Sequence, residues 1–255
     1  VHHTATLIPA KGMYAGRETN LLICVVNKTQ VSQVARIIRK YPYTFSIIDP
    51  TGGGMMIGGG EPSVVHSGVI AIISNKATLN IYGGTIKLAD SHNDVSKGGV
   101  ITASGNLNIY GGTIIGGDIT GNGGTICVSK GVTFNMYGGI VKGGSVNKSL
   151  AKGGNIYNEG TMNLYGGTIE GGKTTAGSSH GGNIYNAGTL NVYGGTVKNG
   201  TAENGTHGGN IYAGSGAVTI SGGRIEGGKA GSGKGHDVML MAGTLNLTGG
   251  TVGKV

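Results

Sequence analysis

The chain has 255 residues, of which 56 are glycine and none is tryptophan, and its formal net charge is +8. The glycines follow no three-residue period, which excludes a collagen triple helix, and β-branched and aromatic residues recur at fixed offsets, which excludes a glycine-rich disordered chain. No run of Lys and Arg is interleaved with aromatic residues, and no apolar run reaches membrane-spanning length. We therefore expect neither a nucleic-acid partner nor a direct membrane span.

The first 50 residues form a region of different composition, because they contain only two of the glycines. An apolar run over residues 20–26 predicts a strand, and residues 44–48 predict a second one. Between them, apolar residues at helical spacing predict a helix that ends at Pro42. The region is therefore expected to be a small β-α-β segment.

A phrase of nine residues, Thr-Leu-Asn-Ile-Tyr-Gly-Gly-Thr-Ile or a close variant, recurs seven times in the rest of the chain. Successive copies are 28, 27, 28, 28, 28 and 27 residues apart. A fixed period of this size is typical of a solenoid, in which each coil buries its apolar face against its neighbours. The tyrosine of the phrase gives way to Ser221 and Thr248 in the last two copies. In the first five copies it occurs at Tyr82, Tyr110, Tyr137, Tyr165 and Tyr193.

Each copy of the repeat predicts several short strands. Alternation within Thr-Leu-Asn-Ile-Tyr places Leu and Ile on one face and Thr, Asn and Tyr on the other. The paired glycines predict a tight corner, the following Thr-Ile a second strand, and a later Gly-Gly-Asn-Ile-Tyr a third. Three short strands per coil predict an all-β solenoid, a parallel β-helix of about seven coils whose crossovers are right-handed.

Two phrases carry a resemblance to a known architecture: Leu-Asn-Ile-Tyr-Gly-Gly-Thr-Ile and Gly-Gly-Asn-Ile-Tyr-Asn-Ala-Gly-Thr-Leu. They resemble the Gly-Gly-Thr-Ile coils of bacterial cell-surface proteins with a pectate-lyase-like, right-handed parallel β-helix. The resemblance covers residues 62–255 and is specific for architecture, not for activity. It implies an extracellular or bacterial cell-surface location.

Residues 10–48 carry a second resemblance, through Lys-Gly-Met-Tyr-Ala-Gly, Leu-Leu-Ile-Cys-Val-Val and Val-Ala-Arg-Ile-Ile-Arg. These phrases are similar to the small cytosolic C-terminal domain of YitT-type membrane proteins, which implies a ligand-sensing role. The open β-edge of the first coil favours a capping role instead. We interpret residues 1–50 as a capping or accessory segment, 51–61 as a glycine-rich linker and 62–255 as the repeats.

Equivalent residues of stacked coils lie about 4.8 Å apart, so each repeated position forms a row along the solenoid axis. The repeated asparagines are expected to form a structural ladder through amide hydrogen bonds, interrupted by Thr219. The ladder positions are Asn80, Asn108, Asn135, Asn163, Asn191 and Asn246. The tyrosines of the phrase form an outward row that either packs along the solenoid or offers a binding face to a partner.

Two further rows carry ionisable side chains. One position alternates in sign, so neighbouring coils are expected to pair opposite charges. Its residues are Lys142, Glu170, Lys198 and Glu226. His180, His207 and His236 precede the third strand in successive coils and are expected within about 5 Å of one another. That spacing suits a transition metal, but a surface row of turn residues is the interpretation we prefer.

No constellation in the repeats predicts catalysis. Asp90, His92 and Asp94 form the one tight acidic group, in a loop that we interpret as an ordinary polar loop rather than a cation site. Cys24 and Cys127 lie within apolar runs and are expected to be buried free thiols. We therefore expect no enzyme activity, no cofactor and no metal.

The preferred function is an extracellular or cell-surface structural or adhesion module, a stiff spacer with repetitive faces. Partners are either further copies joined end to end in filaments, or cell-surface glycans or proteins. Because the repeats continue to Val255 without a visible cap, either more chain follows or the open end pairs with another copy. A carbohydrate-binding or polysaccharide-active protein is the first alternative, and ligand sensing through residues 10–48 is the second.

Overall fold

The computed structural model describes the backbone of four N-terminal strands and, with side chains, residues 69–72, 75–88, 97–204, 207–231 and 234–253. The chain divides into two compact units, residues 1–43 and 44–255, which are described separately.

The first unit contains an antiparallel hairpin of β1 (Ala5–Lys11) and β2 (Glu18–Cys24). Strand β2 overlaps the strand predicted over residues 20–26. Strand β1 was not predicted, because Pro9 interrupts its apolar residues. The predicted helix and the side chain of Cys24 lie outside the described residues.

The second unit begins with another hairpin, formed by β3 (Ser46–Asp49) and β4 (Gly54–Ile57). Strand β4 then pairs in parallel with β5 (Ile70–Ile72), the first strand of the repeats. Part of the segment interpreted as a glycine-rich linker therefore belongs to a sheet of the solenoid.

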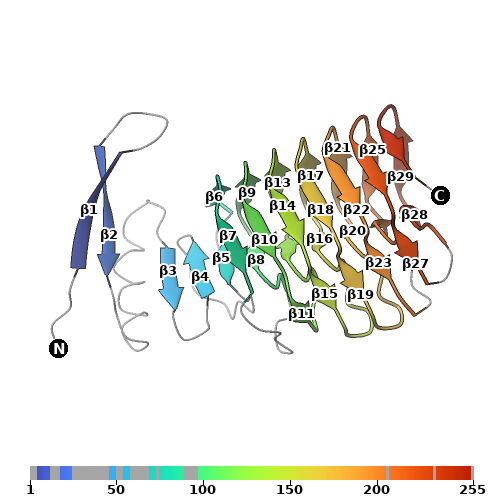
Figure 1. Cartoon of the computed structure of the whole chain (residues 1–255), viewed down its shortest axis with the longest axis horizontal. Helices are drawn as coiled ribbons and strands as arrows, with labels where there is room; N and C mark the ends of the chain where they lie inside the picture. Colours follow the sequence, from blue (N-terminus) through green and yellow to red (C-terminus); the bar gives the residue numbers. More distant parts are fainter. Residues whose placement is uncertain are drawn as a thin grey trace. The chain divides into compact units, whose positions relative to one another are not determined.

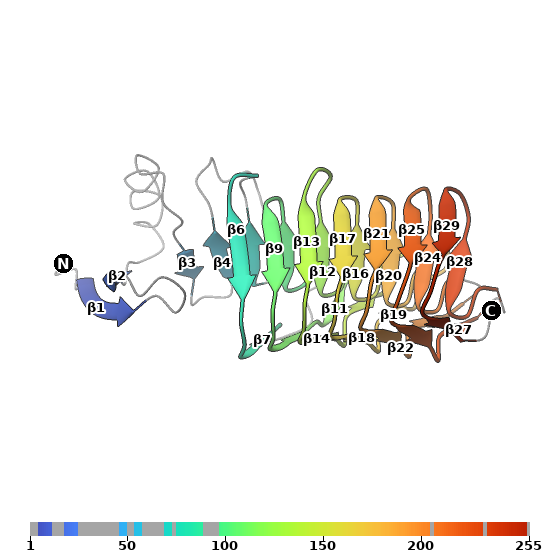
Figure 2. The ribbon, with the colours of Figure 1, turned by 90° about the horizontal axis from the view of Figure 1, so that it is seen from above.

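The repeats form an all-β, right-handed parallel solenoid, as predicted, in which each of the five central coils contributes to four sheets and the first and last coils to three among the described residues (Figures 1 and 2). The first sheet continues from β5 with β8 (Ile101–Ala103), β12 (Ile126–Val128), β16 (Ile156–Asn158), β20 (Ile184–Asn186), β24 (Ile211–Ala213) and β28 (Val238–Leu240). The second sheet comprises β6 (Thr78–Ile81), β9 (Asn106–Ile109), β13 (Thr133–Met136), β17 (Thr161–Leu164), β21 (Thr189–Val192), β25 (Ala217–Ile220) and β29 (Thr244–Leu247).

The other two sheets complete each coil. The third sheet comprises β7 (Thr85–Lys87), β10 (Thr113–Ile115), β14 (Ile140–Lys142), β18 (Thr168–Glu170), β22 (Thr196–Lys198), β26 (Arg224–Glu226) and β30 (Thr251–Val252). The fourth comprises β11 (Asp118–Ile119), β15 (Ser145–Val146), β19 (Lys173–Thr174), β23 (Thr201–Ala202) and β27 (Lys229–Ala230). The second and third sheets each have seven strands, so about six full turns separate the first coil from the last.

The prediction of three strands per coil was wrong, because the two-residue strands of the fourth sheet were missed. They are too short to show alternation and too polar to form an apolar run. The period itself is confirmed by the register, in which Asn108 lies opposite Asn80 and Asn135 opposite Asn108.

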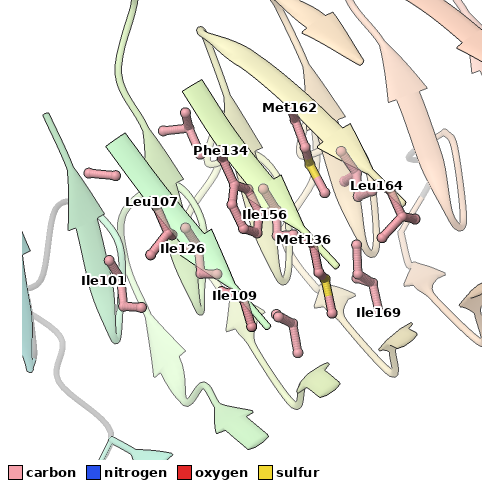
Figure 3. Close-up of a cluster of buried hydrophobic side chains, with 14 of the residues drawn as sticks. Ile101, Leu107, Ile109, Ile126, Phe134, Met136, Ile156, Met162, Leu164 and Ile169 are labelled. Carbon is pink, nitrogen blue, oxygen red and sulfur yellow. The ribbon is translucent and has the colours of Figure 1, made fainter. Parts of the chain in front are cut away.

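The core runs along the solenoid axis and consists of the inward side chains of every coil (Figure 3). In one coil, Ile156, Met162, Leu164 and Ile169 come from three different sheets and are fully buried. Each such side chain stabilises the fold by about 1.5–3 kcal/mol. The predicted alternation in the repeat phrase, with Leu and Ile inward and Tyr outward, is therefore confirmed.

The paired glycines make the corner between the second and third sheets. Gly139 has φ of +85°, and a Cβ there would lie 2.8 Å from the carbonyl oxygen of Gly112 in the preceding coil. Only glycine adopts this conformation at so close an approach of two backbones. The same corner directs the preceding tyrosine away from the core.

Candidate functional site

The first asparagine ladder, which we call the outer ladder, lies on the outer face of the second sheet, where its bonded residues are half-buried except for the exposed Asn80. Each amide Nδ2 of this ladder donates to the Oδ1 of the preceding coil, at 2.9 Å for all four bonds. The bonded residues are Asn80, Asn108, Asn135, Asn163 and Asn191. Thr219 lies opposite Asn191, and Asn246 lies opposite Thr219. The row of asparagines is therefore interrupted at Thr219, as predicted. Its amides mainly join one coil to the next.

The outward tyrosines form what we call the tyrosine stripe: Tyr82, Tyr110, Tyr137, Tyr165 and Tyr193. Successive rings are nearly parallel, with interplanar angles of 6–11° and centroids 4.9–5.0 Å apart. The residues remain 43–54% exposed. Each inner ring therefore has a neighbouring ring against both faces, and the exposed part of these residues lies along the ring edges. The rings therefore pack on one another along the solenoid and stay partly exposed, whereas the alternative of a binding face for a partner stays a prediction.

A second, buried amide ladder was missed by sequence reasoning. Asn155 donates to Asn183 at 2.8 Å, Asn183 to Asn210 at 2.7 Å, and Asn210 to Asp237 at 2.6 Å. Asn155, Asn183 and Asn210 are fully buried, and each Oδ1 also accepts from a glycine N–H of its own coil. The signal was present in the repeated phrase Gly-Gly-Asn-Ile-Tyr, which was used only to predict a strand. This ladder fastens the fourth-sheet corner to the first sheet.

The other tyrosine column, Tyr157, Tyr185 and Tyr212, differs from the stripe because it is only 5–8% exposed. It lies on the outer face of the first sheet in register with Cys127 and Met239. Burial, assisted by the hydrogen bond from its hydroxyl to Glu159 at 2.9 Å, raises the pKa of Tyr157. Burial also raises the pKa of the free thiol of Cys127 to about 12, so the prediction of a buried free thiol is confirmed for Cys127.

A row of mostly basic residues lies in the turns that lead into the first sheet, and we call it the basic row. Its members follow from backbone pairing in each successive coil: Lys97, Asn122, Lys152, His180, His207 and Lys234. The His180 and His207 rings stack with centroids 5.4 Å apart, close to the expected spacing. The prediction that His236 is the third member of this row was wrong, because Lys234 occupies the next place and His236 lies two residues further along. His236 instead accepts a hydrogen bond at Nδ1 from the N–H of Ala230 at 3.1 Å.

The alternating charges of the third sheet lie opposite one another in register, as predicted. Lys198 Nζ lies 3.3 Å from a carboxylate oxygen of Glu170, whereas Glu226 forms its ion pair with Arg224 in its own strand. These pairs are partly exposed and contribute only about 0–1 kcal/mol each. The alternating charges therefore favour the correct pairing of neighbouring coils more than they stabilise the solenoid.

Within the residues that the structure describes, no group of three or more His, Cys, Asp or Glu is placed to bind a metal ion. The loop with Asp90, His92 and Asp94 lies outside those residues. No helix in the described part of the chain is long and apolar enough to cross a membrane. We take the outward rows of repeated side chains as the candidate sites.

Comparison with known proteins identifies one stretch. Residues 3–49 match the family model described as "Uncharacterized protein conserved in bacteria (DUF2179)". The matched stretch overlaps the residues that resemble the YitT-type domain and lies outside the repeats. No curated protein and no solved structure matches the chain.

Proposed function

We propose that the solenoid is an extracellular or bacterial cell-surface adhesion module that acts as a rigid, non-catalytic spacer. The observation that carries the proposal is the tyrosine stripe, five stacked rings that remain 43–54% exposed along one corner of the solenoid. Exposed aromatic rows of this kind are typical of interaction surfaces, and tyrosine is among the residues that contribute most to protein interfaces. The resemblance of the repeats to surface-protein coils supports the location.

The geometry of the stripe favours a protein partner over a sugar chain. Sugars stack on the faces of aromatic rings, but the faces of Tyr110, Tyr137 and Tyr165 are covered by their neighbours in the stripe. The exposed part of the stripe is therefore made of ring edges, which suit the mixed apolar and polar surface of a protein. Carbohydrate binding and ligand sensing through residues 10–48 stay as the alternatives.

The solenoid suits a spacer because its coils are joined continuously along the axis. Four sheets of parallel hydrogen bonds connect the central coils, and at least one of the two amide ladders joins each coil to the next. Bending the solenoid would stretch many of these bonds at once, so the stripe keeps a fixed spacing. End-to-end filaments are an extension of this proposal and are tested by electron microscopy of the purified chain.

The test is binding of the full chain to a panel of immobilised extracellular-matrix proteins, with a glycan array measured in parallel. A stripe variant, Tyr110→Ser with Tyr137→Ser and Tyr165→Ser, is compared with a matched variant carrying Phe at the same positions. Each central interface tyrosine is worth about 1–2 kcal/mol, so the Ser variant is expected to lose binding by more than about 30-fold. Unchanged protein binding by the Ser variant would refute the proposal, and glycan binding alone would favour the first alternative.

A further inference from the structure

The buried amide ladder ends at Asp237, where the repeat carries a carboxylate instead of an amide. In the earlier coils, as at Asn183, Oδ1 accepts from a glycine N–H, and Nδ2 donates both to a third-sheet carbonyl and to the next ladder residue. Asp237 keeps the accepting half of this pattern, since its Oδ1 accepts from Asn210 Nδ2 at 2.6 Å and from the N–H of Gly228 at 2.8 Å. Its other oxygen, Oδ2, replaces the amide nitrogen, and a carboxylate oxygen only accepts.

The group opposite Asp237 Oδ2 is an oxygen as well. The carbonyls that accept from the ladder amides belong to the last residues of third-sheet strands: Glu170, Lys198 and Glu226. In the last coil this position is Gly253, because Val252 lies opposite Ile225 and the N–H of Gly253 donates to the carbonyl of Ile225. A Cβ at Gly253 would lie 2.6 Å from Asp237 Oδ2, so the two residues are close. The register therefore sets a carboxylate oxygen beside a carbonyl group, where the earlier coils join an amide to a carbonyl.

The negative charge of Asp237 is buried and has no cationic partner within the described residues. The side chain is 1% exposed. The ion pairs of the described residues involve Lys173, Lys198 and Arg224, and Oδ2 of Asp237 accepts no hydrogen bond from these residues. Burying a carboxylate is costly unless a cation balances its charge. The unbalanced charge points to a cationic ligand.

Asp237 lines a hollow of about 220 Å³, together with Gly227, Gly228 and His236. The two glycines have no side chains to fill this space. His236 Nδ1 accepts from the N–H of Ala230, so the proton of the neutral ring lies on Nε2 and the ring offers no free lone pair. The protein atoms that remain for a ligand are therefore oxygens, which suit hard metal ions.

We propose that Asp237 and the carbonyl group of Gly253 bind a calcium ion. Calcium accepts irregular sets of carboxylate, carbonyl and water oxygens, whereas magnesium requires a nearly ideal octahedron. A site with a single carboxylate contains no group of three acidic or histidine ligands, which agrees with the absence of such a group from the described residues. The ion joins the turn before β28 to the end of β30, as the ladder amides join the equivalent segments in earlier coils. Because the protein supplies few ligands, we expect a dissociation constant of about 1 mM, a value found for extracellular calcium modules.

The test adds CaCl2 to the full chain at constant ionic strength, with MgCl2 and methylammonium chloride as comparison cations. The NMR signal of the Gly228 amide is the reporter, since this N–H donates to Asp237 Oδ1. Asp237→Asn removes the charge and keeps the shape of the side chain, whereas Gly253→Ala keeps the charge and fills the space beside Oδ2. The matched control, Glu170→Gln, removes the same charge from a carboxylate that is already paired with Lys198. Thermal unfolding without added metal checks that all three variants fold.

We expect Ca²⁺ to shift the Gly228 signal of the wild type in a saturable manner, with half-saturation at about 1 mM. At about 10 mM Ca²⁺, the midpoint of thermal unfolding should rise by about 3–6 °C. Asp237→Asn and Gly253→Ala should each weaken binding at least tenfold, whereas Glu170→Gln should stay within about twofold of the wild type. The absence of a saturable shift in the wild type, an equal shift in Asp237→Asn, or binding of Mg²⁺ or methylammonium as tight as that of Ca²⁺ would each overturn the proposal.

Discussion

The replacement Asn183→Ala removes the centre of the buried amide ladder. Asn183 Oδ1 accepts from Asn155 Nδ2 and from the N–H of Gly172, both at 2.8 Å. Its Nδ2 donates to the carbonyl of Lys198 at 2.8 Å and to Asn210 Oδ1 at 2.7 Å. All four bonds are lost in a fully buried site, where water does not readily replace them.

The expected loss follows from the partners that are left behind. The Asn155 amide still donates to the carbonyl of Glu170, and Asn210 Oδ1 still accepts from Gly200, whereas Gly172 N–H loses its acceptor. An orphaned buried group costs about 1–3 kcal/mol, and weakened neighbours add to that, so we expect a loss of about 3–5 kcal/mol. In the outer ladder, Asn163 is only half-buried, so Asn163→Ala removes two bonds that water can partly replace and should cost only about 0.5–1.5 kcal/mol.

Guanidinium unfolding of the full chain measures both losses, and hydrogen exchange locates them, because solenoids open coil by coil. Exchange should accelerate at Gly172 and its neighbours in the Asn183 variant only. Asp237→Asn is a control at the ladder's last position, which only accepts from Asn210 and Gly228, so its loss should stay below about 1 kcal/mol. Equal losses for the two alanine variants would refute the reasoning that burial decides the contribution of these amides.

Three further predictions concern the corner, the charges and the thiol. Gly139→Ala should lower the unfolding free energy measured in guanidinium by about 2–4 kcal/mol. Gly131 has a similar φ but no atom within 4 Å of a new Cβ, so Gly131→Ala should cost about 1 kcal/mol. Equal costs would contradict a steric role for the corner. Lys198→Gln should lower the unfolding free energy by at most about 1 kcal/mol at low salt. A larger loss would contradict the small contribution assigned to the ion pair with Glu170. The thiol of Cys127 should resist a maleimide at pH 8 in the folded chain and react after unfolding, because burial raises its pKa to about 12. Rapid labelling of the folded chain would contradict its burial.

Much of the solenoid could be predicted from the sequence because its signals are local and repeated. The spacing of the tyrosine phrase gave the register, and alternation within Leu-Asn-Ile-Tyr gave the inward and outward faces, as the buried Leu107 and Ile109 show. The outer ladder followed from the register alone, since any repeated amide meets its equivalent one coil away.

What escaped prediction depends on geometry that single phrases do not encode. The fourth sheet has strands of two residues, such as Lys173–Thr174, which form only because the coil turns there and backbone groups need partners. The buried role of Asn155 depends on the N–H of Gly144, eleven residues earlier. His236 was assigned to the wrong row because it lies two residues before its first-sheet strand, whereas His180 and His207 lie four residues before theirs.

The stacking register is the central claim, because every row described above depends on it, and disulfide trapping tests it most directly. Asn135 lies opposite Asn163 in neighbouring strands, whereas Thr161 lies opposite Thr133. With Asn135→Cys and Asn163→Cys, mild oxidation followed by peptide mapping should find an intramolecular disulfide in most molecules, since paired Cα atoms lie within the range that a disulfide spans. With Asn135→Cys and Thr161→Cys, little should form. A disulfide in the second pair but not the first would contradict the register, and with it the tyrosine stripe and the basic row.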